Sequence, residues 1–419
     1  MRTWAVAAVA GVLGLGLACG DSEQSPPPAL PGEPQIPAPP EPPSKPEPEP
    51  GPFSCEDLLP APVSPVSRDI VTGFNDSCEL HPAMDGAGNL AYAAGYAGYG
   101  TYRWYVRSPE WSPLNSFISR PTPDLWPQAH GFQTVSLICG GATSGIEFEA
   151  FDGMGQSLTT VGLGNYSGCD GAEFHDAADP AGGTVVAWVR PTSGELDERQ
   201  RELKVQRFDG TGQTRFAAVT VATWLLGAQE QLAVVVGTDV QGRALVLWNG
   251  DAFFGAGTTA GRWLDAQGAP LTPIFQAQVP SLGSASMSRA LTPLIGGGLV
   301  LQLDGMWTRS FASGVSSASA PPDWLAQRRG RLEIVRGGRA YALLPPTPSA
   351  PVCTQQVEVL APDGTSCGVM TFETEPGACA SDPLVLGADG TILQQQPLAH
   401  LLENGMNGCI EKWWPGILH

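Results

Sequence analysis

Residues 239–248 read Asp239-Val-Gln-Gly-Arg-Ala-Leu-Val-Leu-Trp248, a glycine turn that leads directly into an apolar strand. The same order of turn and strand recurs about every 50 residues, and a regular period of this size indicates a repeat architecture. The other copies are Asp85-Gly-Ala-Gly-Asn-Leu-Ala-Tyr-Ala93, Thr134-Val-Ser-Leu-Ile-Cys139, Pro180-Ala-Gly-Gly-Thr-Val-Val-Ala-Trp188, Gly296-Gly-Gly-Leu-Val-Leu301, Arg336-Gly-Gly-Arg-Ala-Tyr-Ala-Leu343 and Ala388-Asp-Gly-Thr-Ile-Leu393.

A second motif follows several of these copies, and it consists of an apolar strand end and then Asp-x-x-Gly. It is typical of a hairpin whose turn needs a glycine at positive φ and an aspartate that accepts backbone N–H groups. The instances are Phe151-Asp-Gly-Met-Gly155, Phe208-Asp-Gly-Thr-Gly212, Leu264-Asp-Ala-Gln-Gly268 and the looser Asp363-Gly364. Two hairpins per period make one four-stranded antiparallel sheet.

The repeats therefore predict an all-β fold over residues 54–419, a β-propeller of about seven four-stranded blades. The runs at 185–188 and 244–248 are apolar on both faces, as expected for strands packed between neighbouring blades. Short helical turns are expected only at 324–331 and 398–403. The alternative is a pair of β-sandwich domains with a boundary near 314–322.

The N-terminus predicts export. Arg2 precedes an apolar stretch that is too short to span a bilayer and fits a signal peptide over residues 1–18. The sequence Leu17-Ala18-Cys19-Gly20 resembles a bacterial lipoprotein signal, although Gly16 stands where that signal usually has leucine. The resemblance implies lipidation of Cys19. Because glycine and not aspartate follows the cysteine, it also implies anchoring at the outer membrane, on its periplasmic or cell-surface side.

A proline-rich linker is predicted over residues 19–53, and it begins with this cysteine. Fourteen of the 27 residues from 26 to 52 are proline. Proline fixes φ and removes a backbone donor, which predicts a disordered, polyproline II-like stalk. At about 3.1 Å per residue the stalk would extend to roughly 100 Å. The repeats, over most of residues 78–419, are similar to those of secreted propeller-like lipoproteins of high-GC Gram-negative bacteria, a resemblance that brings no catalytic residues with it.

Eight cysteines remain beyond Cys19, and an exported chain keeps such cysteines as disulfides. They are Cys55, Cys78, Cys139, Cys169, Cys353, Cys367, Cys379 and Cys409. Eight cysteines allow 105 pairings. Clustering along the chain favours 55–78, 139–169, 353–367 and 379–409, and the pair 353–367 is favoured most because the Asp363-Gly364 turn lies between its members. Neither metal-ligand spacing nor a cofactor motif accompanies them, so we expect no metal and no cofactor.

The net charge of −19 argues against nucleic acid as a partner, because a phosphate backbone needs a basic surface. Catalytic signatures are also missing, since Gly141-Ala-Thr-Ser-Gly145 has the wrong spacing for a nucleophile elbow. His175, close to Asp176 and Asp179, is interpreted as a loop histidine beside a turn, with a metal-ligand or general-base role as the alternative.

Twelve tryptophans are a high count for this length. Trp188, Trp248 and Trp263 lie on repeat strands and are expected in the core. The other candidates are interpreted as packing residues, with a platform for sugars or peptides as the alternative. They are Trp104, Trp111, Trp126, Trp413, Trp414, Tyr96, Tyr99, Tyr102 and Tyr105.

Two classes of function stay open. The first is a non-enzymatic envelope lipoprotein whose propeller binds or scaffolds an unidentified protein or glycan, and whose lipid anchor is its membrane contact. The alternative is a glycan-cleaving hydrolase or lyase, because propellers also host paired carboxylates. The sequence names no such pair, so catalytic and ligand-binding residues are unknown and the non-enzymatic class is preferred.

Overall fold

The structure is a computed structural model in which the chain divides into residues 1–51 and 52–419. All described residues belong to the second part. They are residues 55–59, 63–71, 82–98, 101–119, 125–138, 144–166, 173–191, 200–225, 232–283, 288–374, 379, 383–397 and 408–419. Among them, no helix has the length and apolar character needed to cross a membrane.

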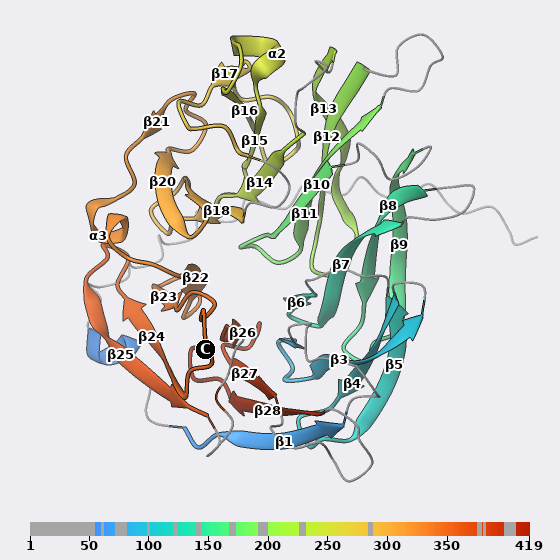
Figure 1. The fold of residues 1–419 in the computed structure, drawn as a ribbon, viewed down its shortest axis with the longest axis vertical. Coiled ribbons are helices and arrows are strands. Elements are labelled where there is room, and N and C mark those ends of the chain that lie inside the picture. The colour runs from blue at the N-terminus through green and yellow to red at the C-terminus, as the bar shows by residue number, and fades with distance from the viewer. Residues whose placement is uncertain are drawn as a thin grey trace, which may run out of the picture. The chain divides into compact units, whose positions relative to one another are not determined.

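Residues 66–414 form seven four-stranded antiparallel sheets arranged as a seven-bladed β-propeller, which confirms the predicted fold (Figure 1). The two-sandwich alternative is wrong, because the region near 314–322 lies within and just after blade 5. Blades 1 to 3 comprise β2 (Ala83–Met84), β3 (Leu90–Gly98), β4 (Thr101–Arg107) and β5 (Pro113–Ser119); β6 (Trp126–Gln128), β7 (Gly131–Ile138), β8 (Ser144–Phe151) and β9 (Ser157–Tyr166); and β10 (Glu173–Ala178), β11 (Thr184–Pro191), β12 (Gln200–Phe208) and β13 (Thr214–Leu225).

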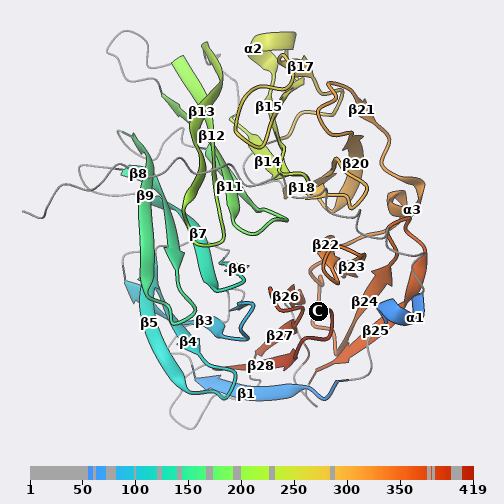
Figure 2. The same ribbon diagram turned by 180° about the vertical axis from the view of Figure 1, so that it is seen from behind.

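Blades 4 to 7 continue around the ring in the same order, as the view from behind also shows (Figure 2). They comprise β14 (Val234–Thr238), β15 (Ala244–Asn249), β16 (Thr259–Leu264) and β17 (Phe275–Gln276); β18 (Arg289–Pro293), β19 (Leu299–Leu303), β20 (Met306–Phe311) and β21 (Ala318–Ser319); β22 (Arg331–Val335), β23 (Ala340–Leu344), β24 (Thr354–Leu360) and β25 (Ser366–Glu373); and β26 (Val385–Leu386), β27 (Ile392–Pro397), β28 (Gly408–Trp414) and β1 (Val66–Val71).

Each of the seven repeat copies supplies the second strand of a blade, from β3 to β27. Two of them, β11 and β15, are almost entirely apolar on both faces because each lies between two neighbouring blades. In β15, Ala244, Val246 and Trp248 pack toward blade 3, whereas Leu245 and Leu247 pack toward blade 5. Trp188, Trp248 and Trp263 are buried, which confirms their predicted place in the core.

The Asp-x-x-Gly motif forms the predicted turn between the third and fourth strands. After β8, Asp152 Oδ1 accepts the N–H groups of Met154 at 2.9 Å and Gln156 at 2.8 Å. Gly155 has φ of 75°, and a Cβ on it would lie 2.6 Å from Val106 of blade 1. The glycine therefore serves the turn and also the close approach of neighbouring blades.

The ring is closed by pairing of an N-terminal strand with a C-terminal strand. β1 pairs with β28 in antiparallel register from Val66 opposite Trp413 to Val71 opposite Gly408, and so becomes the outermost strand of blade 7. The last blade therefore contains strands from both ends of the propeller, and backbone pairing between them closes the ring.

In the described part of the chain, three short helices accompany the blades: α1 (Cys55–Leu58), α2 (Asp251–Phe254) and α3 (Asp323–Ala326). α3 overlaps the start of the helical stretch expected at 324–331. The second expected stretch, 398–403, lies outside the described residues.

Candidate functional site

The innermost strands of the blades line the axis of the ring, and the candidate site lies on β10. Its sequence is Glu173-Phe-His-Asp-Ala-Ala178, whereas β14 beside it reads Val234-Val-Val-Gly-Thr238 and carries no ionisable side chain. Alternate side chains of a strand point to opposite faces. Glu173 and His175 therefore face the neighbouring blade on one side, and Asp176 faces the neighbouring blade on the other side.

His175 connects three blades. Its Nε2 donates to the main-chain oxygen of Arg289 on β18 at 3.1 Å, and its Nδ1 accepts the N–H of Val236 on β14 at 3.3 Å. This arrangement needs the neutral ring, because Nδ1 must carry a lone pair. Burial lowers the pKa of His175 to about 4. The sequence interpretation of a loop histidine is wrong, because His175 lies within a strand and faces two neighbouring innermost strands.

Glu173 and Arg289 complete this contact. They form a buried ion pair from β10 to β18, and Arg289 Nε also donates to the main-chain oxygen of Val234 on β14 at 3.1 Å. We call Glu173, His175 and Arg289 the axial latch. Its side chains cover the inner edge of β14, every residue of which is buried.

The close approach of these strands explains Gly237 on β14. A Cβ at this position would lie 2.7 Å from both the Cβ and the main-chain oxygen of Leu291 on β18. Any side chain would therefore push blade 5 away from blade 4 and lengthen the hydrogen bonds of the latch.

Asp176 joins β10 to blade 2, the neighbour on the side away from blade 4. Its Oδ2 accepts the indole N–H of Trp126 on β6 at 2.5 Å. Asp179, the third residue of this sequence cluster, lies in the turn after β10 and belongs to a different contact. The structure thus places His175, Asp176 and Asp179 in three separate interactions and does not bring them together as a metal site. Among the described residues, no group of three or more His, Cys, Asp or Glu side chains could hold a metal ion.

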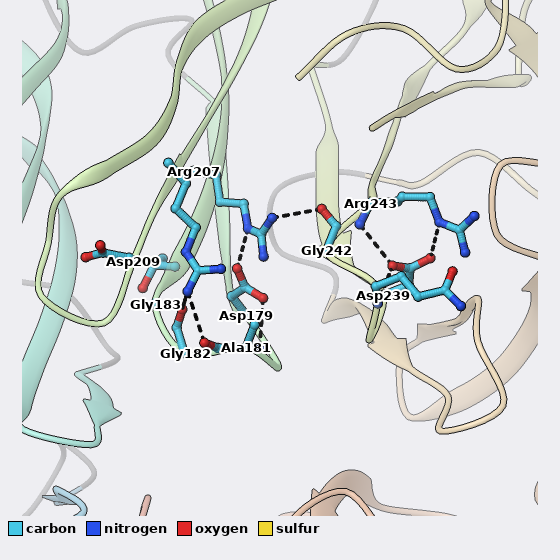
Figure 3. Close-up of polar contacts among 12 residues, drawn as sticks. Asp179, Ala181, Gly182, Gly183, Arg207, Asp209, Asp239, Gly242 and Arg243 are labelled. Atoms are coloured by element: carbon cyan, nitrogen blue, oxygen red, sulfur yellow. Dashed lines mark hydrogen bonds and ion pairs between the residues drawn. The ribbon is translucent and has the colours of Figure 1, made fainter. Parts of the chain in front are cut away.

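Asp179 pairs with Arg207 at the turn edge of blade 3, and both side chains are buried (Figure 3). Arg207 Nη1 also donates to the main-chain oxygen of Gly242 in blade 4 at 2.9 Å. The equivalent turn of blade 4 holds an ion pair between Asp239 and Arg243 at 2.9 Å. Removing one partner of a buried pair leaves an uncompensated charge, so the pair of Asp179 and Arg207 holds the turns of blades 3 and 4 together.

The aromatic residues divide between core and seam. Trp104 and Trp414 are buried, and Tyr105, Tyr92, Trp111 and Trp413 form a stacked series with centroid spacings of 5.8, 6.0 and 5.8 Å. This series joins blade 1 to blade 7. Tyr96 and Tyr102 lie opposite each other in the register of β3 and β4, and Tyr99 is outside the described residues.

Trp111 occupies the place of the repeat glycine in the turn of blade 1. Its φ is 69°, which is unfavourable for a bulky side chain. In blades 2 and 3 the corresponding glycine touches the preceding blade, and for blade 1 the preceding blade is blade 7. Packing against Trp413 compensates the backbone cost. This geometry fits the packing interpretation of Trp111 and Trp413 better than an open platform for ligands.

The structure contradicts three of the four expected disulfide pairs. Cys55 bonds to Cys367 and Cys353 to Cys379, so the pairs 55–78, 353–367 and 379–409 are wrong. Cys409 is disulfide-bonded as well. The expected pair of Cys139 and Cys169 lies outside the described residues.

The register of β24 and β25 explains the failure of the 353–367 pair. Thr354 lies opposite Glu373, which places Cys353 at the end of the hairpin farthest from the Asp363-Gly364 turn. Cys367 lies near that turn, one residue after Ser366, the partner of Leu360.

Glu173 and Arg289 are the latch residues that the sequence did not single out. The available signal was local, because an innermost strand that starts with a glutamate departs from the apolar pattern of β14. The partner of that glutamate lies 116 residues away and carries no motif.

Comparison with known proteins gives neither family nor activity. No family model and no curated protein matches the chain. Cobalt-substituted Synechocystis apocarotenoid oxygenase aligns with a TM-score of 0.41 at 11% identity, over 82% of this chain and 90% of that chain. A chain of the mitotic checkpoint complex aligns with a TM-score of 0.36 at 11% identity, over 90% and 96%. A puromycin hydrolase mutant aligns with a TM-score of 0.38 at 13% identity, over 77% and 50%.

The pH dependence of stability follows from His175. In the unfolded chain histidine takes up a proton below about pH 6.5, but the folded ring resists it until about pH 4. The unfolded state therefore binds more protons between these values, and stability decreases as the pH falls. The shift corresponds to about 3 kcal/mol of unfolding free energy.

Urea unfolding of the wild type and of His175→Gln from pH 7 to pH 4 measures this contribution. We expect the wild type to lose about 3 kcal/mol more than the variant over that range. His130→Gln, at an exposed turn, is the matched control and should keep the wild-type slope. Parallel slopes for wild type and His175→Gln would show that His175 is not held neutral.

Proposed function

We propose that this chain is a lipoprotein of the outer membrane, held by acyl groups on Cys19, whose propeller acts as a non-enzymatic binding or scaffolding module. The signal-like stretch over residues 1–18 and the proline-rich stretch over 26–52 support the anchoring part of the proposal. The partner is a protein or a glycan.

The mutual engagement of the polar groups on β10 carries the non-enzymatic part. Both ring nitrogens of His175 are bound to main-chain groups, Glu173 is paired with Arg289, and Asp176 accepts from Trp126. Each contact joins different blades. A general base needs a basic lone pair within reach of substrate, whereas His175 uses its lone pair to hold Val236.

The two carboxylates of β10 also lie unfavourably for glycan cleavage. A glycosidase places two carboxyl groups about 5 to 10 Å apart on either side of one glycosidic bond. Glu173 and Asp176 point to opposite faces of β10, toward blades 5 and 2 respectively. They therefore do not face a common substrate position, and the hydrolase alternative receives no support from them.

Exposed apolar side chains at the edge opposite the aspartate turns suggest where a partner binds. Leu225 ends β13 and is 58% exposed, and Phe254 of α2 is 39% exposed. Phe253, next to Phe254 in α2, contacts Trp224 and Trp248 at 6.0 and 5.7 Å between ring centroids. A rigid aromatic base under exposed apolar residues is typical of a binding hot spot.

A combined binding and turnover assay separates the two classes of function. The unacylated chain, residues 20–419, is incubated with peptidoglycan fragments and an oligosaccharide panel while new reducing ends are measured. In parallel, the anchored chain with a photo-crosslinker at Leu225 is irradiated in its own membrane. We expect a discrete crosslink that Phe254→Asp abolishes, and no new reducing ends.

Variants of the two latch residues Glu173 and Arg289 provide the control for the turnover assay. Reducing ends formed by the wild type, lost in Glu173→Gln and retained in Arg289→Gln would show that Glu173 is catalytic and would contradict the proposal. Loss in both variants would indicate damage to the latch, so the melting temperature of each variant is measured alongside.

A further inference from the structure

The first described residues of the chain wrap around two blades. α1 lies against β25 of blade 6, where Leu59 approaches Gly368, and β1 completes blade 7. Leu58 is buried in a core shared by blades 6 and 7, and Val63 packs against the same core. We call residues 55–59 and 63–71 the strap.

Two side-chain contacts hold the strap at its beginning. Cys55 is bonded to Cys367 of β25, with a Cα–Cα distance of 4.9 Å and 312 residues between them in sequence. Arg336, in the first turn of blade 6, donates from Nε to the main-chain oxygen of Leu58 at 3.3 Å. The same guanidinium donates to the main-chain oxygens of Ile417 and His419 at 3.2 and 2.7 Å.

The helical part of the strap is short. A four-residue helix is not stable by itself in water. In β1, which follows it, Arg68 and Asp69 are exposed and Val66 is half-buried. The covalent bond therefore supplies the local concentration that keeps Leu58 and Leu59 against blade 6.

We propose that the strap is a redox-dependent closing element: oxidation of Cys55 and Cys367 holds it on blades 6 and 7, and reduction releases its first part from the ring. In the reductive step a dithiol thiolate attacks one sulfur of the bridge and the other sulfur leaves as a thiolate. The second thiol of the reagent then displaces the first sulfur. The two cysteines gain two electrons and two protons, and the dithiol becomes a cyclic disulfide.

The redox state of the compartment therefore decides whether the strap completes the ring. In a reducing compartment the strap is loose, and in an oxidising one it is fixed. This device is independent of the proposed binding function, since it acts at blades 6 and 7 and not at the apolar edge of blades 3 and 4.

Hydrogen–deuterium exchange of the full chain in the Cys19→Ser background tests the proposal. We expect exchange at residues 55–59 and 63–66 to be at least tenfold faster in Cys55→Ser/Cys367→Ser than in the parent. Cys353→Ser/Cys379→Ser is the matched control, because it removes a bridge of the same blade and leaves the strap bonded. That variant should exchange within twofold of the parent in these residues.

A second arm keeps the wild-type cysteines. The folded parent is treated with dithiothreitol, free thiols are alkylated, and exchange is measured in the fraction modified at Cys55 and Cys367. Fast exchange in the strap and unchanged exchange in β11 and β15 are expected. Unchanged exchange at 55–66 in that fraction, or equal acceleration in the control variant, would overturn the proposal.

Discussion

Deleting residues 405–419 is expected to abolish cooperative unfolding of the whole ring. β28 lies between β1 and β27, so its removal breaks both ladders and separates blade 7 from its outer strand. The buried side chains of Trp413, Trp414, Ile417 and Leu418 are lost at the same time. At about 1.5 to 3 kcal/mol each, they amount to about 10 kcal/mol, which is comparable with the stability of a whole domain.

Circular dichroism and calorimetric melts of the wild type and the truncated chain measure this effect. The wild type should show one main transition, and the truncated chain should show none of comparable amplitude. Deletion of residues 26–40, which removes the same number of residues from the linker, is the control and should leave the melt unchanged. If the truncated chain kept a full-amplitude transition of its N-terminal half, the ring would consist of independent parts.

The repeat pattern was sufficient to predict the blades because it reflects local physics. A glycine at positive φ and an aspartate that accepts N–H groups form the turn of several hairpins, as Asp152 and Gly155 illustrate. A strand that packs between two neighbours favours apolar residues on both faces, as in β15. Both features recur in several periods and are therefore visible in a single sequence.

Contacts between distant repeats could not be predicted in the same way. Glu173 and Arg289 belong to blades 3 and 5, and their pairing depends on how far the innermost strands converge at the axis. Cys55 reaches Cys367 because the strap runs back across blade 6, a path that no local motif encodes. The prediction that each cysteine pairs with its neighbour in sequence was therefore wrong where the chain crosses the ring.

Trp111 is an intermediate case. Its turn, Ser108-Pro-Glu-Trp-Ser112, has the hydrogen bonds of the repeat, with Trp111 N–H donating to the oxygen of Ser108 at 2.9 Å. The motif is hidden because serine replaces aspartate and tryptophan replaces glycine. The replacement is explained only by the ring closure, which brings Trp413 next to Trp111.

Replacing Cys19 by serine is expected to have the largest effect on where the protein resides. The acyl chains on Cys19 are the membrane attachment in our proposal. Two acyl chains give stable anchoring, whereas a chain without them has only weak surface contacts to hold it. The variant should move from the membrane fraction to the soluble fraction or remain unprocessed, while its ring stays folded.

Mass spectrometry of the mature N-terminus, combined with detergent partitioning of wild type and Cys19→Ser, tests the central claim of a membrane-anchored binding ring most directly. The account predicts a wild-type chain that begins at Cys19, carries acyl groups there and partitions into detergent, and a variant that does neither. Identical fractionation of the two chains, with an unmodified N-terminus at any other residue, would contradict it.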